Sequence, residues 1–501
     1  MNLRTELLSN ASRDAVSSDL TADAPCFFLL RNWLRNCDEN HAYCDGRPGK
    51  EDFWLKRVIY VGDSNKLALV EQRPKGEDYL VLSHCWGLPK DKAEAEQEKN
   101  RFCTTTKNHH DRLQGFSYSE LPKTFQDAVQ VTRALQKQYL WIDALCIIQG
   151  PDGDWDTEAK TMADIFASAY CTIAASSARG WGDGFLKQQL DRPAIGARGT
   201  LSTPVCTCEF GKDVEEGALM KRAWVLQERV LSRRIIHITT AHIYCECGDG
   251  VLCEQLTKLE PPSGKQYFIL DPNFPSRLNR SGYTRTIDFV QFLFKNYSTS
   301  CLTFETDREF AIHSLVERAG EVLQTEVRYG VFRCFLGSLL LWKRTQENKS
   351  PPIPYKVRTV PSWSWMAYSG GIDFISDAKR DLMVPDYQDL DFADGGQALN
   401  VKVRQFGGNC RLSKKGEEHA IVDGAKEVGS VWFDVADQIQ LEDCNCVVVS
   451  MPKDGKKYGP RKTYHILIIR KKIRDREYER VGVGKVEAQY VSSDGSTRTL
   501  W

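Results

Sequence analysis

The chain of 501 residues lacks an excess of charge of either sign, because 67 Lys and Arg balance 67 Asp and Glu. Such a balance gives no basic field for nucleic acid or an anionic membrane surface. The longest strongly apolar segment, Cys334–Trp342, falls far short of the roughly 20 residues that a membrane-spanning helix needs. The first residues, MNLRTELLSNASRDAVSSDL, have no apolar signal core. These absences predict a soluble, cytoplasmic protein with no nucleic-acid partner and no membrane span.

The sequence also lacks a GxGxxG or Walker loop, which disfavours a redox Rossmann enzyme or an NTPase. It has no internal repeat. Since cores seldom grow past about 250–300 residues, this length predicts several domains. We expect an N-terminal helix and strand segment, an α/β domain, a helical region and a β-rich C-terminal region, at residues 1–78, 79–250, 251–356 and 357–501.

Residues 121–177 carry the clearest secondary-structure pattern. Apolar residues at helical spacing predict helices at Pro122–Gln136 and Trp155–Ala169. The nearly continuous apolar runs Tyr139–Ile148 and Cys171–Ala175 are typical of strands buried on both faces. Strands that alternate with helices predict a parallel sheet flanked by helices, with YLVLS at 79–83 as a further strand. Beyond this domain, helical patterns occur at Phe289–Tyr297, Asp307–Leu323 and Gly330–Trp342.

The seventeen cysteines do not indicate a disulfide scaffold, because their number is odd and several lie in apolar runs. Three sets resemble metal ligands. Cys37, His41 and Cys44 share one face of a predicted helix, while Cys206-x-Cys208 and Cys245-x-Cys247 are close pairs. No set has a four-ligand zinc spacing, and the first also continues an apolar stripe. The sequence therefore assigns no metal ligand and leaves zinc binding open.

Three motifs occur in order: YLVLSHCWG at 79–87, LPKTFQDA…WIDALCIIQ…DWDTEAKTMADIF…AY at 121–170, and RAWVLQERVLS at 222–232. On these motifs the sequence resembles the heterokaryon-incompatibility (HET) domain family of filamentous fungi, and residues 79–250 would be the HET domain. The flanking WLRNC…H…C and PSWSWMA also resemble family members. One difference is His84, where many members carry Tyr. The resemblance implies self/non-self recognition in which the domain triggers growth arrest or programmed cell death.

HET domains are in turn distantly similar to Toll/interleukin-1 receptor (TIR) domains, which implies a flavodoxin-like sheet. Enzymatic TIR domains carry a Trp-x-x-x-Glu signature whose Glu is needed for cleavage of NAD. Trp224 and Glu228 stand at the matching place. The similarity thus implies an NAD glycohydrolase (NADase), a hydrolase with Glu228 as its catalytic residue. The long connection Arg179–Met220 has no counterpart in TIR domains.

The chemistry of Glu228 supports this role independently. Trp224 and Glu228 are i and i+4, so the indole and the carboxylate are neighbours on a helix. A partly desolvated carboxylate has a raised pKa, and a carboxylate can stabilise the oxocarbenium-like state of a breaking nicotinamide–ribose bond. The alternative is a structural role in ion pairs with the nearby arginines, Arg222, Arg229, Arg233 and Arg234.

Other candidate residues surround the ends of the predicted strands. Ligands bind beyond the carboxyl ends of parallel strands, so we expect Ser83, His84, Cys85, Trp86 and Gly87 to contact the substrate. Asp143, mid-strand in the prediction, is either structural or part of the same site. A Cys85 nucleophile would need His109 or His110 as its base, because the adjacent His84 points to the opposite face. Helix capping explains Asp154, Asp156 and Glu158.

Two classes of function remain open. One is an enzyme that takes NAD or a related nucleotide as substrate and holds no permanently bound cofactor. The other is a non-enzymatic signalling module that acts by self-association or by recruiting a regulatory protein partner.

Overall fold

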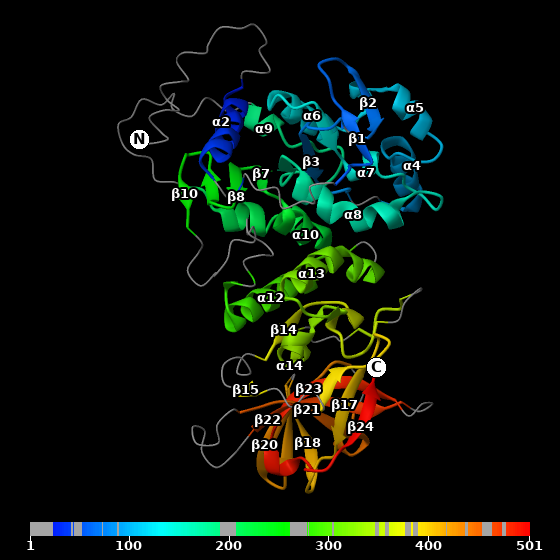
Figure 1. The fold of residues 1–501 in the computed structure, drawn as a ribbon, viewed down its shortest axis with the longest axis vertical. Coiled ribbons are helices and arrows are strands. Elements are labelled where there is room, and N and C mark those ends of the chain that lie inside the picture. Colours follow the sequence, from blue (N-terminus) through cyan, green and yellow to red (C-terminus); the bar gives the residue numbers. More distant parts are fainter. Residues whose placement is uncertain are drawn as a thin grey trace. The chain divides into compact units, whose positions relative to one another are not determined.

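The computed structural model describes most of the chain, which forms two compact units, Met1–Phe274 and Pro275–Trp501 (Figure 1). Among the described residues, no helix combines the length and the apolar character needed to cross a membrane. The described residues are 24–41, 44, 53–72, 74–87, 90–190, 207–260, 278, 280–302, 305–345, 350–355, 360–375, 382–383, 389–416, 418–435, 439–452, 463–472 and 477–501.

A mixed sheet forms the centre of the first unit. Its four central strands are parallel and lie in the order β5 (Tyr139–Trp141), β3 (Tyr79–Ser83), β6 (Cys171–Ala174) and β7 (Arg234–Ile238). In chain order this is 2-1-3-4, the flavodoxin-like order, which reverses direction between β3 and β6. The predicted parallel sheet flanked by helices is therefore confirmed.

Antiparallel strands extend this sheet at both sides, and those before residue 79 are the strands expected in the N-terminal helix and strand segment. Next to β5 lie β1 (Arg57–Tyr60), β2 (Lys66–Glu71) and β4 (Phe116–Ser117). Next to β7 lie β8 (Ile243–Cys247), β9 (Gly250–Cys253) and β10 (Lys258–Leu259). The segment before residue 79 thus belongs to the same sheet as the predicted α/β domain.

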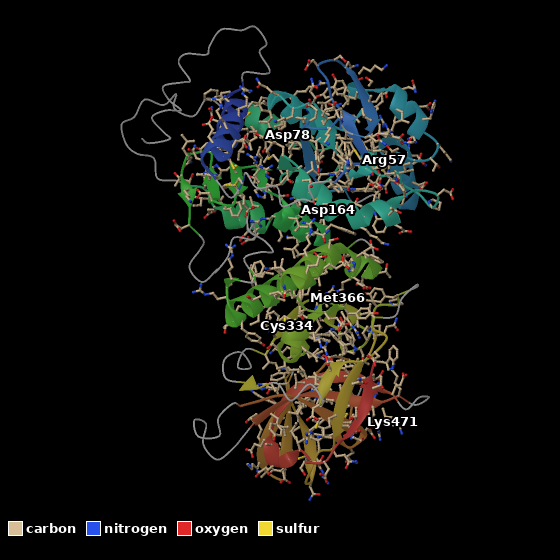
Figure 2. All side chains as sticks on the ribbon, in the orientation of Figure 1. Arg57, Asp78, Asp164, Cys334, Met366 and Lys471 are labelled. Atoms are coloured by element: carbon tan, nitrogen blue, oxygen red, sulfur yellow. The ribbon has the colours of Figure 1, made fainter. Side chains whose placement is uncertain are left out.

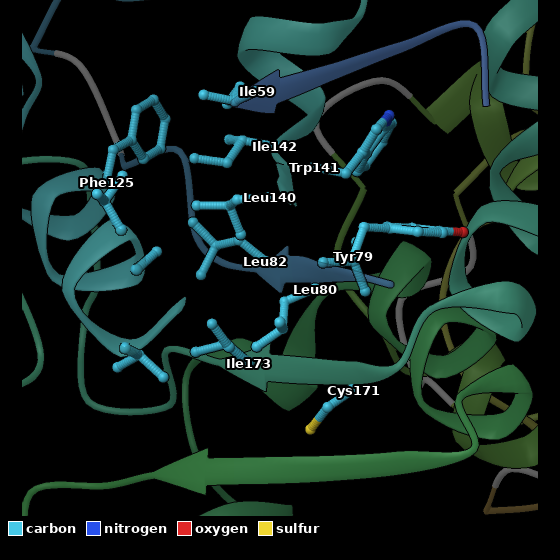
Figure 3. Packing of buried hydrophobic residues seen from close by; sticks show 14 of the residues in the cluster. Ile59, Tyr79, Leu80, Leu82, Phe125, Leu140, Trp141, Ile142, Cys171 and Ile173 are labelled. Atoms are coloured by element: carbon cyan, nitrogen blue, oxygen red, sulfur yellow. The ribbon is translucent and has the colours of Figure 1, made fainter. Parts of the chain in front are cut away.

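Helices cover both faces of the parallel strands. Phe125 of α6 (Lys123–Ala134) packs on the face that carries Leu82 and Leu140 (Figure 3). Tyr79 and Trp141 point the other way, toward α8 (Trp155–Ser168): the Tyr79 hydroxyl donates to the Ile165 carbonyl over 2.6 Å. Burial on both faces explains why these strands are apolar without alternation. α10 (Ala223–Leu231) packs against α8.

The predicted strand Tyr139–Ile148 was wrong in its second half. The strand ends at Trp141, and Asp143–Cys146 forms the short helix α7. The Asp143 carboxylate accepts the Ala144 N–H over 2.7 Å, and the Cys146 N–H bonds the Ile142 carbonyl over 2.8 Å. An apolar run cannot separate a buried strand from a buried helix by periodicity. Asp143 therefore lies just beyond the strand's carboxyl end instead of within it.

The remaining helices of the first unit lie outside the parallel core. The N-terminal helix α2 (Pro25–Asn40) buries Leu30, Trp33 and Leu34. Arg234 of β7 forms an ion pair of 2.6 Å with Asp38 of this helix. The others are α4 (Lys92–Phe102), α5 (His109–Gln114) and α9 (Lys187–Leu190).

The second unit combines helices with a largely antiparallel sheet. Its helices are α12 (Tyr283–Ser298), α13 (Phe310–Val322) and the short α14 (Leu336–Leu340). The predicted helix Gly330–Trp342 was wrong in part, because β12 (Val331–Phe332) occupies its beginning. The β-rich C-terminal region is confirmed. The other strands are β11 (Val327–Arg328), β13 (Trp342–Arg344), β14 (Ile372–Phe374), β15 (Leu382–Met383), β16 (Leu390–Phe392), β17 (Leu399–Arg404), β18 (Cys410–Lys415), β19 (Glu418–Asp423), β20 (Lys426–Phe433), β21 (Cys444–Pro452), β22 (Thr463–Lys471), β23 (Tyr478–Glu487) and β24 (Ser496–Leu500).

Five of these strands pair in a closed ring, β17–β21–β22–β23–β24 and back to β17. The PSWSWMA motif contacts both a helix and a strand of the second unit. The ring centroid of Trp365 lies 5.1 Å from that of Phe294 in α12, and the ring centroid of Trp363 lies 6.1 Å from that of Phe392 in β16. Both tryptophans are buried, as is Met366 of the same motif, which is labelled in Figure 2.

Candidate active site

Ser83 and Glu228 meet at the carboxyl edge of the parallel sheet. Ser83 is the last residue of β3, and its hydroxyl donates to Glu228 Oε2 over 2.5 Å. Glu228 lies in the second half of α10, and both side chains are buried. β3 also borders the point where the strand order reverses, the usual place for a ligand in an open α/β sheet.

The environment of Glu228 makes it titrate near neutrality. Burial raises the pKa of Glu228 to about 7, and the charge of Asp143 acts in the same direction. The Ser83 hydrogen bond and the charge of Arg222 oppose this shift, because both favour the ionised carboxylate. A carboxyl group with this pKa can give or take a proton at physiological pH.

Asp143 connects the end of β5 to the turn after β3. The Trp86 indole N–H donates to Asp143 Oδ2 over 2.8 Å. The His84 Nε2 lies 3.8 Å from Asp143 Oδ1, and burial lowers the pKa of His84 to about 4. His84 is therefore neutral at physiological pH, and its ring packs edge-on against Phe125. This arrangement fixes the turn that carries Ser83.

A loop for which the sequence predicted no role in the site lies against the same turn. Gly87 has φ +94°, and a Cβ there would lie 3.4 Å from the Cα of Gly180. Trp181 packs edge-to-face on Trp86, with ring centroids 5.3 Å apart. Because Gly87 combines a left-handed φ with this close backbone approach, a larger residue would strain the turn.

Asp127 of α6 holds this loop in place. Its buried carboxylate accepts the backbone N–H groups of Phe185 and Leu186 over 2.7 and 3.0 Å. The beginning of the long Arg179–Met220 connection is thereby ordered, whereas residues 191–206 lie outside the described part. The only sequence signals were the GWGDGF run and an acidic residue within the apolar pattern of α6.

The arginines around Glu228 in the sequence are not its hydrogen-bond partners. Each has another described partner: Arg222 donates to the His84 carbonyl, Arg229 to Glu246, Arg233 to the Cys44 carbonyl, and Arg234 pairs with Asp38. Of these four arginines, only Arg222 contributes to the pKa of Glu228. The structure thus favours a desolvated carboxyl over an ion-paired one.

Trp224 has a neighbour other than Glu228. It lies one turn before Glu228 on α10 and packs edge-to-face on Trp155 of α8, with ring centroids 6.1 Å apart.

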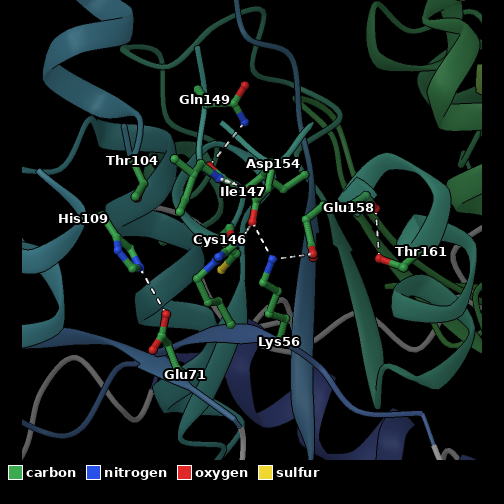
Figure 4. A network of polar contacts seen from close by, with 12 residues as sticks. Lys56, Glu71, Thr104, His109, Cys146, Ile147, Gln149, Asp154, Glu158 and Thr161 are labelled. Atoms are coloured by element: carbon green, nitrogen blue, oxygen red, sulfur yellow. Dashed lines mark hydrogen bonds and ion pairs between the residues drawn. The ribbon is translucent and has the colours of Figure 1, made fainter. Parts of the chain in front are cut away.

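The structure does not favour Cys85 as a nucleophile. Burial raises the pKa of the Cys85 thiol, which disfavours the thiolate that a nucleophile needs. The proposed base His109 forms an ion pair of 3.3 Å with Glu71 (Figure 4), and His110 is exposed. The Cys85 nucleophile gains no support.

Asp154 and Glu158 have a structural role in ion pairs. The Asp154 side chain makes no capping hydrogen bond to α8. Lys56 lies 2.7 Å from Asp154 and 3.3 Å from Glu158 (Figure 4). Arg57, labelled in Figure 2, also pairs with Asp154 and donates to the Cys146 carbonyl over 2.6 Å. These ion pairs tie the start of α8 to β1.

Access to Glu228 is restricted. The side chain belongs to a residue that is only 8% exposed. A cavity of about 560 Å³ lies elsewhere in the unit and contains none of the predicted site residues. It is lined by Lys66, Arg101, Asp111, Arg112, Glu120 and Leu121, among others. A substrate would reach the carboxylate only if neighbouring side chains or the adjacent turn moved.

Part of the chain matches a known family. Residues 79–228 match the family model described as Heterokaryon incompatibility protein (HET). This part of the chain is therefore similar to HET domains. No curated protein and no solved structure matches the chain. The HET match begins with the first residue of β3 and ends at Glu228, so it contains the whole Ser83–Asp143–Glu228 arrangement.

Proposed function

We propose that this HET-domain protein is an effector of fungal self/non-self recognition that cleaves NAD at the nicotinamide–ribose bond. The carrying observation is a buried Glu228 with a pKa of about 7, hydrogen-bonded to Ser83 at the carboxyl edge of a flavodoxin-like sheet. Loss of NAD would then produce the growth arrest or cell death that HET proteins trigger.

In the proposed reaction, the bond between ribose C1′ and the nicotinamide nitrogen breaks, and nicotinamide leaves with the electron pair. The ribose becomes oxocarbenium-like, and the ionised Glu228 carboxylate stabilises its positive charge. Water then adds to C1′ and gives up a proton, which Glu228 can accept. The products are nicotinamide and ADP-ribose.

The neighbouring residues would position rather than react. The Ser83 hydroxyl orients the carboxylate, and the Trp86–Asp143 hydrogen bond fixes the turn beside it. The turn Ser83–Gly87 would contact the substrate once the site opens. We place no metal and no permanently bound cofactor in this reaction, with NAD or a related nucleotide as the substrate.

The test is nicotinamide release from NAD by purified protein, at concentrations that allow self-association. Glu228→Gln keeps the shape but removes the charge, so turnover should fall by at least about a hundredfold. Glu228→Asp should retain little activity, because catalytic groups tolerate little misplacement. Glu216→Gln, at an exposed position before α10, is the matched control and should retain full activity.

The low exposure of Glu228 to solvent favours one alternative, a non-enzymatic signalling module that acts by self-association or by recruiting a regulatory partner. In that case wild type and Glu228→Gln would both release no nicotinamide and would both arrest fungal growth. If instead only the variant fails in both assays while remaining folded, the NADase proposal stands.

A further inference from the structure

Four potential metal ligands from distant parts of the chain converge in the first unit. Cys37, His41 and Cys44 lie on and just after α2, and Cys247 ends β8. One ligand atom from each residue lies within 4.8 Å of the other three. The sequence supplied the first three by their helical spacing. The fourth ligand, far along the chain, could be identified only after the fold had brought β8 beside α2.

The spacing suits a tetrahedral ion. Zn–S bonds of about 2.3 Å place two sulfurs of a tetrahedral site about 3.8 Å apart, and a sulfur and a nitrogen slightly closer. The Sγ of Cys247 and the Nδ1 of His41 are 3.4 Å apart. Small side-chain adjustments would bring all four atoms to bonding distance of one central ion.

A second observation concerns the far side of the imidazole. The His41 Nδ1 faces the thiols, while its Nε2 lies 3.7 Å from Asp249 Oδ2. A metal-bound histidine usually has a carboxylate or a carbonyl beside its outer ring nitrogen, which fixes the tautomer and orients the ring. The Lys258 Nζ forms an ion pair of 2.8 Å with the same Asp249 oxygen, which positions the carboxylate.

The sulfur atoms also have a suitable surrounding. The Asp249 backbone N–H points at the Cys247 sulfur over 3.4 Å, a donor that would stabilise a thiolate. Cys37 and Cys44 are 1% exposed and Cys247 is 5% exposed. None of the three is in a disulfide. Three buried thiols that form no disulfide and one imidazole therefore make a complete set of four ligands.

We propose that Cys37, His41, Cys44 and Cys247 bind one structural zinc ion. Three sulfurs and one nitrogen are a common closed set for zinc, whereas calcium and magnesium require oxygen ligands. No protein position is left open for a water or a substrate, so the ion would stabilise structure and take no part in catalysis.

The proposed zinc joins segments on both sides of the HET match. Three ligands precede residue 79 and the fourth follows residue 228. Two other contacts act at the same junction: Arg234 pairs with Asp38, and Arg233 donates to the Cys44 carbonyl over 2.9 Å. The ion would therefore fix α2 against β8, at the side of the sheet beyond β7.

Elemental analysis of the full-length protein, purified without chelators, tests the proposal directly. We expect one zinc per chain in wild type and loss of this zinc in Cys247→Ser and Cys37→Ser. Cys245→Ser is the matched control, because Cys245 is buried on the same strand but is not one of the four ligands. Its zinc content should equal that of wild type. Glu228→Gln should also keep its zinc, which separates this proposal from the NADase proposal.

If the cysteine variants do not fold, cobalt substitution of wild type still decides the question. Cobalt should give the intense visible bands of a tetrahedral thiolate site, and a chelator should lower the unfolding temperature. A folded wild-type protein that remains metal-free after dialysis against zinc would overturn the proposal. So would mass spectrometry that finds a disulfide between any two of Cys37, Cys44 and Cys247 in freshly purified protein.

Discussion

Ser83 donates its hydroxyl hydrogen to Glu228 over 2.5 Å, and this contact joins the end of β3 to α10. Two opposing effects meet at this carboxyl group. Burial favours the neutral form, while the hydroxyl and the charge of Arg222 favour the ionised form. Burial is the larger effect, so the group carries a measurable cost of ionisation. That cost makes the protonation of Glu228 accessible to stability measurements even without a substrate.

Glu228→Gln should stabilise the protein at pH 8 and change little at pH 4. The pKa of Glu228 rises from 4.5 when unfolded to about 7 when folded, so the folded state binds the proton more tightly. Stability therefore decreases as the pH rises from 4.5 to 7, by about 3 kcal/mol for such a shift. Gln mimics the protonated form and avoids this loss. Denaturant unfolding of both proteins at each pH measures the difference.

The Glu216→Gln protein is again the control, since an exposed carboxyl should show no such pH dependence. A difference between wild type and Glu228→Gln that stays constant from pH 4 to pH 8 would contradict a raised pKa.

Ser83→Ala should destabilise the protein more at pH 8 than at pH 5. Above the pKa of Glu228, the change leaves a buried carboxylate without its hydroxyl donor, which costs about 1–3 kcal/mol. At lower pH the neutral carboxyl loses a weaker contact. If the protein releases nicotinamide, the pH at half-maximal activity should also rise, because the hydrogen bond lowers the pKa of Glu228.

Ser232→Ala provides a matched control for this experiment. Its hydroxyl donates to the backbone carbonyl of Glu228 over 2.6 Å and does not act on the carboxylate. The loss of stability in Ser232→Ala should be independent of pH between 5 and 8. Equal pH profiles for the two serine variants would argue against the Ser83–Glu228 contact.

The sequence predicted those parts of the fold whose hydrophobic pattern has one interpretation. The helix predicted at Pro122–Gln136 is α6, Lys123–Ala134, because its apolar stripe faces the sheet. The strand predicted at Cys171–Ala175 is β6, Cys171–Ala174, because it is buried on both faces. The apolar run after Tyr139 has no such single interpretation, since β5 and α7 are both buried. The break at Asp143 depends on hydrogen bonds that hydrophobicity does not record.

The site was predictable only where its residues follow strands or share a helix. The positions of Ser83 at a strand end and of Glu228 on a helix came from the sequence, but their hydrogen bond required the fold. Asp127 acts on backbone N–H groups of a distant loop, which no local spacing reveals. For the same reason, Cys247 could not be associated with Cys37 before the structure placed β8 beside α2.

Glu246→Gln should strongly destabilise the first unit at pH 7. Arg229 contacts both carboxylate oxygens over 2.7 and 2.8 Å, and His237 lies 2.9 Å away, all of them buried. Breaking a buried ion pair costs about 3–5 kcal/mol, because one charge remains without its partner. The matched control is Glu254→Gln, whose carboxylate pairs with the partly exposed His242 and should cost less.

The cost of Glu246→Gln should decrease in acid. Burial alone would raise the pKa of Glu246, but Arg229 and His237 outweigh it and lower the pKa to about 2. A lowered folded pKa gives stability that is present above pH 4.5 and is lost as the pH falls toward 2. The difference between the urea midpoints of wild type and Glu246→Gln should therefore be smaller at pH 3 than at pH 7. Equal differences at the two pH values would contradict the lowered pKa.

Arg480→Met should destabilise the second unit by about 3–5 kcal/mol, because it breaks the buried ion pair with the Asp434 carboxylate. The Arg480 guanidinium also donates to the carbonyls of Leu340 and Trp342 over 2.6 and 2.5 Å, and it lies 3.5 Å from the Trp342 ring centroid. Arg480→Lys should rescue only part of the loss, since one ammonium group cannot reproduce a planar fork. Arg480→Met combined with Asp434→Asn should be less destabilised than Arg480→Met alone, because the buried negative charge is removed together with the guanidinium that paired with it. Hydrogen exchange of the full-length protein would locate the effect, with protection expected to fall in β23 and β13. An Arg480→Met protein with wild-type exchange rates there would show that these contacts do not stabilise the unit.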